Sequence, residues 1–321
     1  MDDPRKEWLE KRRKGCGASD AAAILGLAKK SRVELWGEKT GRIPEDDLQD
    51  LEFVQWGNIL EEPIAQEVAR RTGYELLDPG RFEIVFSKDH PFMHCTLDRI
   101  IRPIDARGCG TLSIKCAGEY NRADWEDEPP LWAQAQAQQE MLIHEFEWGL
   151  IAPLVGGNKL LLKPIVRNTR FCIMLVESVE EFWAYVQKDE PPPADGTDST
   201  REALRRLYPT ASGESIELPL EAYTWAVRLR QAKEQEKEAK ANVQLYGNLI
   251  QSFLRGATLG LLPPITEDTP ADVRMALTML PVGFEGYTLK NQHRDGYPVA
   301  ACDFRVMREQ IHKTTSLKWR K

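Results

Sequence analysis

The chain has 321 residues and a formal net charge of −7. It is therefore long enough to bury a sizeable core, and its overall charge excludes a protein that coats nucleic acid along its whole surface. Six cysteines are scattered without CxxC or zinc-finger spacing, which favours a reducing cytoplasm. No apolar run approaches the roughly 18 residues of a membrane span, and charged residues stand where a signal peptide would be apolar. We expect a soluble, cytoplasmic protein without a membrane segment.

The N-terminal part of the chain is predicted to be mainly helical. A short helix over 4–14 leads into a glycine-containing turn at 15–20, which can cap the next helix. Apolar residues return at helical spacing over 33–41 and, after an acidic loop, over 53–71. The basic run at 11–14 predicts a local cationic patch in an acidic chain.

From residue 74 the sequence alternates between short strands and helices. Apolar runs bounded by glycine and proline predict strands, and longer apolar stretches at helical spacing predict helices. The strands are expected at 82–86, 93–101, 110–116, 160–165 and 170–176, and the helices at 132–154 and 182–187.

A proline-rich segment over 191–200 is predicted to divide the chain. Three consecutive prolines there can propagate neither a helix nor a strand ladder. We therefore expect a main domain over 1–190, a linker over 191–200 and a C-terminal extension over 201–321. The extension contains a long helix with a charged middle over 217–253, typical of a solvated or partner-binding helix.

Three ionisable residues fall on successive predicted elements: Glu61 on a helix, Asp98 in a strand and Lys115 in the next strand. Side chains alternate along a strand, so Ser113 and Lys115 share one face. Mg²⁺ prefers oxygen ligands, which Glu61, Asp98 and the backbone carbonyl of Ile114 could supply. Lys115 could then orient an attacking water or stabilise developing charge. Each residue alone could be an ordinary surface residue, but together they favour a hydrolytic metal site.

Five blocks of residues occur in the order found in one known family. They are GCGASDAAAILG at 15–26, Glu34-Leu35-Trp36 with Lys39-Thr40-Gly41, Trp56 to Glu61, Met93 to Asp98, and Ile114-Lys115 followed by Gln136, Gln138 and Met141. Over about residues 12–193, this order resembles the YqaJ-like viral recombinase family, relatives of lambda exonuclease within the PD-(D/E)XK nuclease superfamily.

The resemblance implies an α/β (α+β) fold with a central mixed β-sheet flanked by helices. It also implies an exonuclease that uses Mg²⁺, with Mn²⁺ as an alternative, to degrade linear duplex DNA from its ends, 5′ to 3′, in phage-type recombination. A single-strand annealing protein is the expected partner. Whether the chain forms a homo-oligomeric ring stays open.

The resemblance also assigns residues to an active site and to a terminal-phosphate site. Glu61 matches the helix carboxylate, Asp98 the strand metal ligand, Lys115 the motif lysine and Gln138 the active-site glutamine, while Arg12 and Ser19 match the residues that receive the 5′ phosphate. An arginine fork beside a helix N-terminus is a physically suitable anion site.

The chain departs from the family pattern at Ser113, where an acidic residue is expected two positions before Lys115. A neutral hydroxyl is a weaker ligand for a hard cation. Two interpretations stay open: a weakened metal site, or an inactive nuclease fold that binds DNA ends. Some restriction enzymes of the superfamily resemble this arrangement and take a glutamate from a helix, a part that Glu62, Glu119 or Glu140 could play here.

Other clusters predict less. His90, His94 and Cys95 lie within six residues, but such a grouping is usually incidental, and the four-cysteine group of an iron–sulfur cluster is missing. As an alternative function, residues 196–321 could form a partner-docking module for which the nuclease fold is a scaffold.

Overall fold

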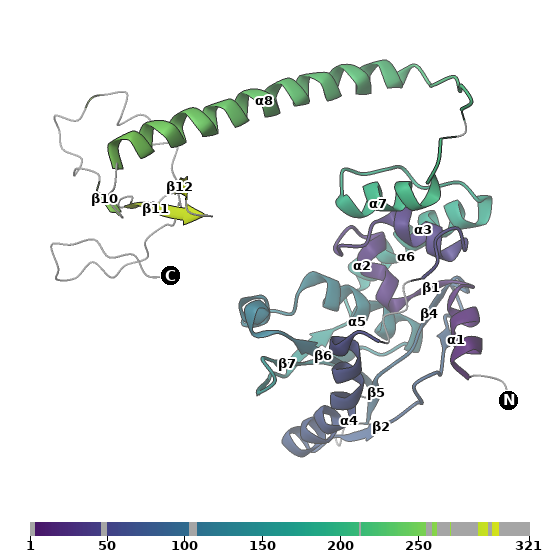
Figure 1. Ribbon diagram of the computed structural model, residues 1–321. Coiled ribbons are helices and arrows are strands. Elements are labelled where there is room, and N and C mark those ends of the chain that lie inside the picture. The colour runs from purple at the N-terminus through teal and green to yellow at the C-terminus, as the bar shows by residue number, and fades with distance from the viewer. Residues whose placement is uncertain are drawn as a thin grey trace. The chain divides into compact units, whose positions relative to one another are not determined.

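The chain forms two compact units, Met1–Gly213 and Glu214–Lys321 (Figure 1). The computed structural model describes residues 4–45, 50–102, 108–211, 213–254, 259–261, 270, 288–294 and 297–301.

The first unit contains helices and a mixed sheet. Its helices are α1 (Pro4–Arg12), η1 (Ala18–Asp20), α2 (Ala21–Ile24), α3 (Arg32–Lys39), α4 (Glu52–Thr72), η2 (Glu119–Trp125), α5 (Leu131–His144), α6 (Thr169–Lys188) and α7 (Asp198–Leu207). Its strands are β1 (Cys16–Gly17), β2 (Glu75–Leu77), β3 (Val85–Phe86), β4 (Met93–Cys95), β5 (Arg99–Arg102), β6 (Gly110–Ala117), β7 (Trp148–Val155), β8 (Lys159–Leu160) and β9 (Lys163–Val166). The predicted mixed α/β fold class is confirmed.

The central sheet has the strand order β2-β5-β6-β7-β8, and β9 also pairs with β7. β5 and β6 run antiparallel, whereas β6 and β7 run parallel with Ser113 opposite Ile151. Parallel neighbours need a crossover connection, and α5 provides it here. β6 therefore lies in the middle of the sheet, and the chain continues from it through η2 to α5.

Alternating side chains along β6 separate an apolar face from a polar one. Leu112 and Ile114 pack with Ile64 of α4, while Thr111 and Ser113 point to the other face, where α5 lies. Thr111 and Ser113 are almost fully buried. A buried polar face is thereby enclosed between the sheet and α5.

The predicted helix over 132–154 is wrong in its second half. α5 ends at His144 because Glu145 adopts a left-handed conformation with φ 58°, and residues 148–155 form β7. β7 is buried on both faces between α4 and α5, so its sequence is continuously apolar and lacks the alternation of a half-buried strand.

The predicted strand over 170–176 is also wrong, because these residues belong to α6 together with the predicted helix 182–187. The buried residues of α6 are Cys172, Leu175, Val179 and Phe182. Their spacing of three and four places them on one helical stripe, which packs into the main core. Tertiary burial of this stripe overrides the local strand preference.

A small second sheet, in the order β1-β4-β3, carries the N-terminal turn. Gly15 allows the chain to pass closely over β4, because a β-carbon there would lie 2.7 Å from the carbonyl oxygen of Phe92. The backbone nitrogen of Cys16 donates to that same carbonyl at 2.7 Å. This contact fixes the turn at 15–20 beside the strand that leads to Asp98.

The predicted linker over 191–200 lies within the first unit, whose boundary falls at residue 213. Pro192 is buried, and Ala203 of α7 packs with Val33 and Ile43. The Ser199 hydroxyl accepts from the backbone nitrogen of Ser31 at 2.7 Å. The prolines therefore connect packed elements, because α7 returns to bury its apolar side against α3.

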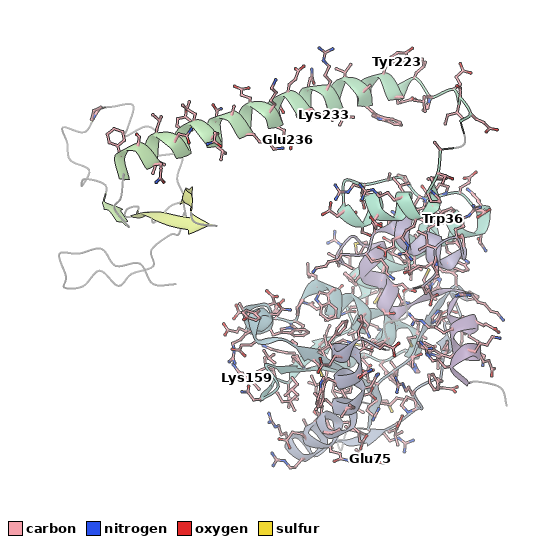
Figure 2. The ribbon with its side chains drawn as sticks, in the orientation of Figure 1. Trp36, Glu75, Lys159, Tyr223, Lys233 and Glu236 are labelled. Carbon is pink, nitrogen blue, oxygen red and sulfur yellow. The ribbon has the colours of Figure 1, made fainter. Side chains whose placement is uncertain are left out.

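The second unit contains α8 (Glu221–Leu254) and the strands β10 (Leu259–Leu261), β11 (Thr288–Arg294) and β12 (Tyr297–Ala301). The three strands form an antiparallel sheet in that order. Side chains project from α8 along its length, among them Tyr223, Lys233 and Glu236 (Figure 2). None of the helices in the described part of the chain is long and apolar enough to cross a bilayer.

The buried His94 generates a prediction about stability. Burial, with the charge of Lys39, lowers the pKa of His94 to about 4, and its ring Nε2 donates to the carbonyl oxygen of Arg12 at 3.1 Å. The unfolded chain takes up a proton on this ring near pH 6.5, but the folded chain does not until about pH 4. The free energy of unfolding should thus fall by roughly 3 kcal/mol on this account as the pH falls through that window.

Urea unfolding between pH 7 and pH 4 checks this expectation. His94→Gln should flatten the pH dependence, while His90→Gln should retain it. An equally steep curve for His94→Gln would assign the acid sensitivity to other groups.

Candidate functional site

Asp98 lies between β4 and β5 and is fixed against β6. Its Oδ2 accepts a hydrogen bond from the backbone nitrogen of Ile114 at 2.7 Å. This bond uses the amide of Ile114, whose carbonyl oxygen the sequence predicted as a metal ligand. The contact holds the Asp98 carboxylate at the middle of β6, between the positions of Ser113 and Lys115.

Glu61 reaches the same region from α4 but is held by an arginine. Its Oε1 accepts from Nη1 of Arg99 at 2.6 Å, and Oε2 of Glu62 accepts from Nη2 of the same guanidinium at 2.7 Å. The Arg99 side chain is only 8% exposed. Burial and the neighbouring charge of Asp98 raise the pKa of Glu61, against the opposing effect of Arg99. Glu61 and Asp98 are therefore electrostatic neighbours.

Ser113 contacts a carboxylate from the helix behind the sheet. Its hydroxyl donates to Oε2 of Glu140 on α5 at 2.6 Å, and the hydroxyl of Thr111 donates to the same oxygen at 3.0 Å. The other oxygen, Oε1, accepts from the amide of Gln136 at 2.8 Å. The polar face of β6 thus surrounds a glutamate that is 1% exposed.

The charges around Glu140 are those of Asp98 and Lys115. Burial raises the pKa of Glu140, the charge of Lys115 lowers it and that of Asp98 raises it further. Lys115 is half-buried and shares the Ser113 face of β6. The structure therefore brings together Asp98, Lys115, Ser113 and Glu140, with Glu61 at the edge of the group.

The donor set suits a hard divalent cation. Carboxylates and hydroxyls are the oxygen ligands that Mg²⁺ takes, and the mutual repulsion of Asp98 with Glu61 and with Glu140 is what a cation would relieve. Within the described ranges, no three His, Cys, Asp or Glu side chains gather closely enough to hold an ion as they stand. Glu61 is turned to Arg99, so it would have to exchange that partner in order to bind metal.

Arg12 and Ser19 meet at the N-terminal turn. Nη2 of Arg12 donates to the Ser19 hydroxyl at 3.2 Å, and the guanidinium carbon lies 4.7 Å from the ring centroid of Trp8. Ser19 belongs to the three-residue turn η1, and the amide of Gly17 at its start donates to the Asp20 carboxylate at 2.8 Å. The anion-binding capacity here comes from the arginine and hydroxyl, because that amide is already used.

A buried network fixes the backbone of Arg12. Its carbonyl oxygen accepts from Nζ of Lys39 at 3.2 Å and from Nε2 of His94 at 3.1 Å. Lys39 also pairs with the buried Asp20 at 2.7 Å. Burial raises the pKa of Asp20, but the charges of Lys39 and Arg12 and the hydrogen bonds from Lys39 and Gly17 together lower it to about 2. A fixed backbone limits the positions that the Arg12 guanidinium can reach.

One cleft of about 410 Å³ connects the carboxylates with Arg12. Its lining includes Trp8, the four arginines Arg5, Arg12, Arg81 and Arg99, and the four carboxylates Glu45, Glu61, Asp78 and Asp98. A smaller adjoining pocket is lined by Ser19, Thr96 and Gln136 as well as Arg12. The cleft therefore offers guanidinium donors and carboxylate oxygens side by side, with similar numbers of positive and negative groups.

The structure does not bring Gln138 to this group. Its amide nitrogen donates to the carbonyl oxygen of Val166 at 2.9 Å, and its amide oxygen accepts from the backbone nitrogen of Asn168 at 2.8 Å. Successive helical residues are about 100° apart, so Gln136 and Glu140 share a face that Gln138 cannot share. Helical spacing could therefore have identified Gln136, whereas the structural role of Arg99 has no signal in the sequence.

Comparison with known proteins identifies a family and a curated relative that this chain resembles. The model of the YqaJ-like viral recombinase domain matches residues 7–147. The uncharacterized protein YqaJ of Bacillus subtilis (strain 168) is 32% identical over 264 residues, which cover 80% of this chain and 81% of that protein.

Three solved structures are similar in outline. An alkaline exonuclease, LHK-Exo, from Laribacter hongkongensis is 16% identical with a TM-score of 0.48 and covers 57% of this chain and 93% of its own. LHK-Exo in complex with dAMP gives 17% and 0.49 with the same coverage. A phage related exonuclease from Haemophilus somnus 129PT gives 13% and 0.43, covering 54% of this chain and 94% of that one.

The position of Gln138 generates a prediction about stability. Gln138→Ala removes partners from two backbone groups where β9 meets α6, so the free energy of unfolding should fall by about 1–3 kcal/mol. Gln136→Ala should cost less, because Glu140 keeps two hydroxyl donors. Urea unfolding of both variants checks the order, and the reverse order would contradict the hydrogen bonding described here.

Proposed function

Because this chain belongs to the YqaJ-like viral recombinase family, we propose that it is a metal-dependent exonuclease. Its substrate is linear duplex DNA, which it degrades from the ends, 5′ to 3′, in phage-type homologous recombination. The enzyme acts in the cytoplasm beside a single-strand annealing protein.

The observation that carries the proposal is the single cleft that contains Asp98, Glu61 and Arg12. A nuclease that works from DNA ends needs oxygen ligands at the scissile phosphate and a cationic group for the terminal phosphate. Both occur here on one surface, where four arginines stand beside four carboxylates in a chain of net charge −7. Such a local patch can bind the DNA backbone although the whole chain is acidic.

Each residue has a role in phosphodiester hydrolysis. Asp98 and Glu61, with the Ile114 carbonyl oxygen, would hold Mg²⁺ or Mn²⁺, and the cation would supply Lewis-acid polarisation of the phosphate and the attacking water. The charges of Lys115 and Asp98 both act on Glu140, and from this position the ammonium group of Lys115 would orient the water and stabilise charge that develops on the phosphate. The oxygen of the water bonds to phosphorus, and the 3′ oxygen leaves with a proton.

Arg12 and Ser19 bind the 5′ phosphate of the strand being degraded. The guanidinium can donate in a forked geometry to phosphate oxygens, and Trp8 beneath it limits its movement. Hydrogen bonds from Lys39 and His94 to the Arg12 carbonyl oxygen hold its backbone in place. The distance between this pair and Asp98 along the cleft would then determine which bond is cleaved.

The alternative is a DNA-end-binding protein without hydrolytic activity. Ser113 is neutral, and Glu61 is engaged by Arg99. In that case the cleft would retain linear DNA without forming any Mg²⁺-dependent product. An assay that measures binding and degradation on the same substrate separates the two functions.

Replacement of Asp98 tests the proposed reaction. Asp98→Asn should reduce Mg²⁺-dependent degradation of linear duplex DNA by about a hundredfold or more, because a neutral amide loses the charge that anchors the cation. Asp124→Asn, an exposed carboxylate outside the cleft, is the control. Nucleotide release from labelled DNA is the measurement. Full activity in a folded Asp98→Asn protein would contradict the role of Asp98 as a metal ligand.

Replacement of Arg12 tests the end recognition. Arg12→Ala should abolish the preference for 5′-phosphorylated over 5′-hydroxyl ends, and it should change the maximal rate less. Arg13→Ala is the matched control, because Arg13 belongs to the same basic run and lies near Glu45 at 3.6 Å. If Arg12→Ala keeps the preference, the phosphate is bound elsewhere.

A further inference from the structure

Glu140 differs from the other buried carboxylates in having no ion-pair partner among the described residues. Asp20 pairs with Lys39 at 2.7 Å, and Glu38 pairs with Lys30 at 2.6 Å. Glu140 is as buried as these two, but its contacts are neutral: two hydroxyls and one amide. A buried carboxylate without a cation is costly, so its position needs a reason beyond packing.

The hydrogen bonds of Glu140 orient it without saturating it. A carboxylate offers about four acceptor positions, and three donors occupy Glu140. Two of these donors come from β6 and the third from the preceding turn of α5. These hydrogen bonds fix the orientation of the Glu140 carboxylate, as outer hydrogen bonds do for a metal ligand before the cation binds.

The contact with Ser113 distinguishes Glu140 from two other nearby glutamates. Glu62 is 59% exposed and binds Arg99 and Gln66. Glu119 is 58% exposed and binds Arg122 beyond the end of β6. Glu140 alone of the three meets the Ser113 hydroxyl, and the charges of both Asp98 and Lys115 act on it.

We propose that Glu140 supplies from α5 the metal-binding carboxylate that Ser113 does not supply from β6. The carboxylate has moved from the strand to the helix, and the Ser113 hydroxyl positions it. The metal site is then Asp98 with Glu140, and Glu61 joins when it leaves Arg99. This inference rests on the proposed nuclease function, and it assigns the serine a positioning role where the family pattern has a ligand.

Titration of the full-length protein with Mn²⁺ alone, beside a linear-DNA assay, tests the proposal. Glu140→Gln keeps the size of the side chain and removes its charge, so Mn²⁺ affinity should fall at least tenfold and degradation about a hundredfold. Glu119→Gln should change neither quantity. A folded Glu140→Gln protein with the Mn²⁺ affinity of the wild type would overturn the inference.

A transposed variant covers the case in which Glu140→Gln does not fold. Ser113→Glu combined with Glu140→Ser returns the carboxylate to the strand and keeps a hydroxyl beside it. Mn²⁺ affinity should recover to within about tenfold of the wild type. Ser113→Glu alone should bind Mn²⁺ at least as tightly as the transposed protein, because two facing carboxylates repel in the absence of metal and the cation relieves that repulsion. A transposed protein that folds but does not bind Mn²⁺ would count against the exchange.

The two assays separate this inference from the proposed function. If the wild-type protein binds Mn²⁺ through Glu140 but leaves DNA intact, the metal-binding role of Glu140 is supported and the exonuclease function is contradicted. If the wild-type protein degrades DNA and Glu140→Gln is equally active, only the metal-binding role of Glu140 is contradicted. Absence of Mn²⁺ binding in the wild type would reject both.

Discussion

The alternation of side chains along β6 is the constraint on which the site depends. One face of the strand contributes Leu112 and Ile114 to the core beneath α4, and the other contributes Thr111 and Ser113 to a polar space beneath α5. Shifting the strand by one residue would exchange these faces. The pairing of β6 with both β5 and β7 prevents such a shift, so the register that builds the core also places the hydroxyls.

Two buried carboxylates of this unit, Asp20 and Glu140, have different surroundings. Asp20 is neutralised by Lys39, and that pair, together with His94, fixes the backbone of Arg12. Glu140 is surrounded by neutral donors and shares its region with Asp98 and Lys115. The first arrangement is complete by itself, whereas the second leaves a carboxylate pair whose repulsion a bound cation would reduce.

Arg99 connects the cleft to its carboxylates. It pairs with Glu61 and Glu62 and lies 3.9 Å from Asp78, so its charge partly offsets the acidity of this region. The same cleft is lined by Arg5, Arg12 and Arg81. Four carboxylates, Glu45, Glu61, Asp78 and Asp98, line the cleft beside these arginines, so positive and negative groups balance within it.

The local sequence was sufficient to predict helices and strands whose apolar residues recur at a regular spacing. Helices α1 and α4, the strand β6 and the alternation of Ser113 and Lys115 follow from periodicity and turn residues. The family resemblance correctly identified the family, and Asp98, Lys115 and Ser113 lie together at β6. Packing decided the rest. The continuous apolar run of β7 is a strand because both its faces are covered, and residues 170–176 are helical because one stripe of α6 is buried.

The choice between Glu62, Glu119 and Glu140 could not be made from spacing along the chain. Glu140 is 27 residues from Ser113, and only the crossover from β6 through α5 to β7 brings them within 2.6 Å. The same applies to Gln136 and Gln138, since the direction of each side chain depends on which face of α5 meets the sheet. Sequence alone determined which chemical groups are present, while the tertiary structure decided which of them meet, because contacts across elements depend on how those elements pack.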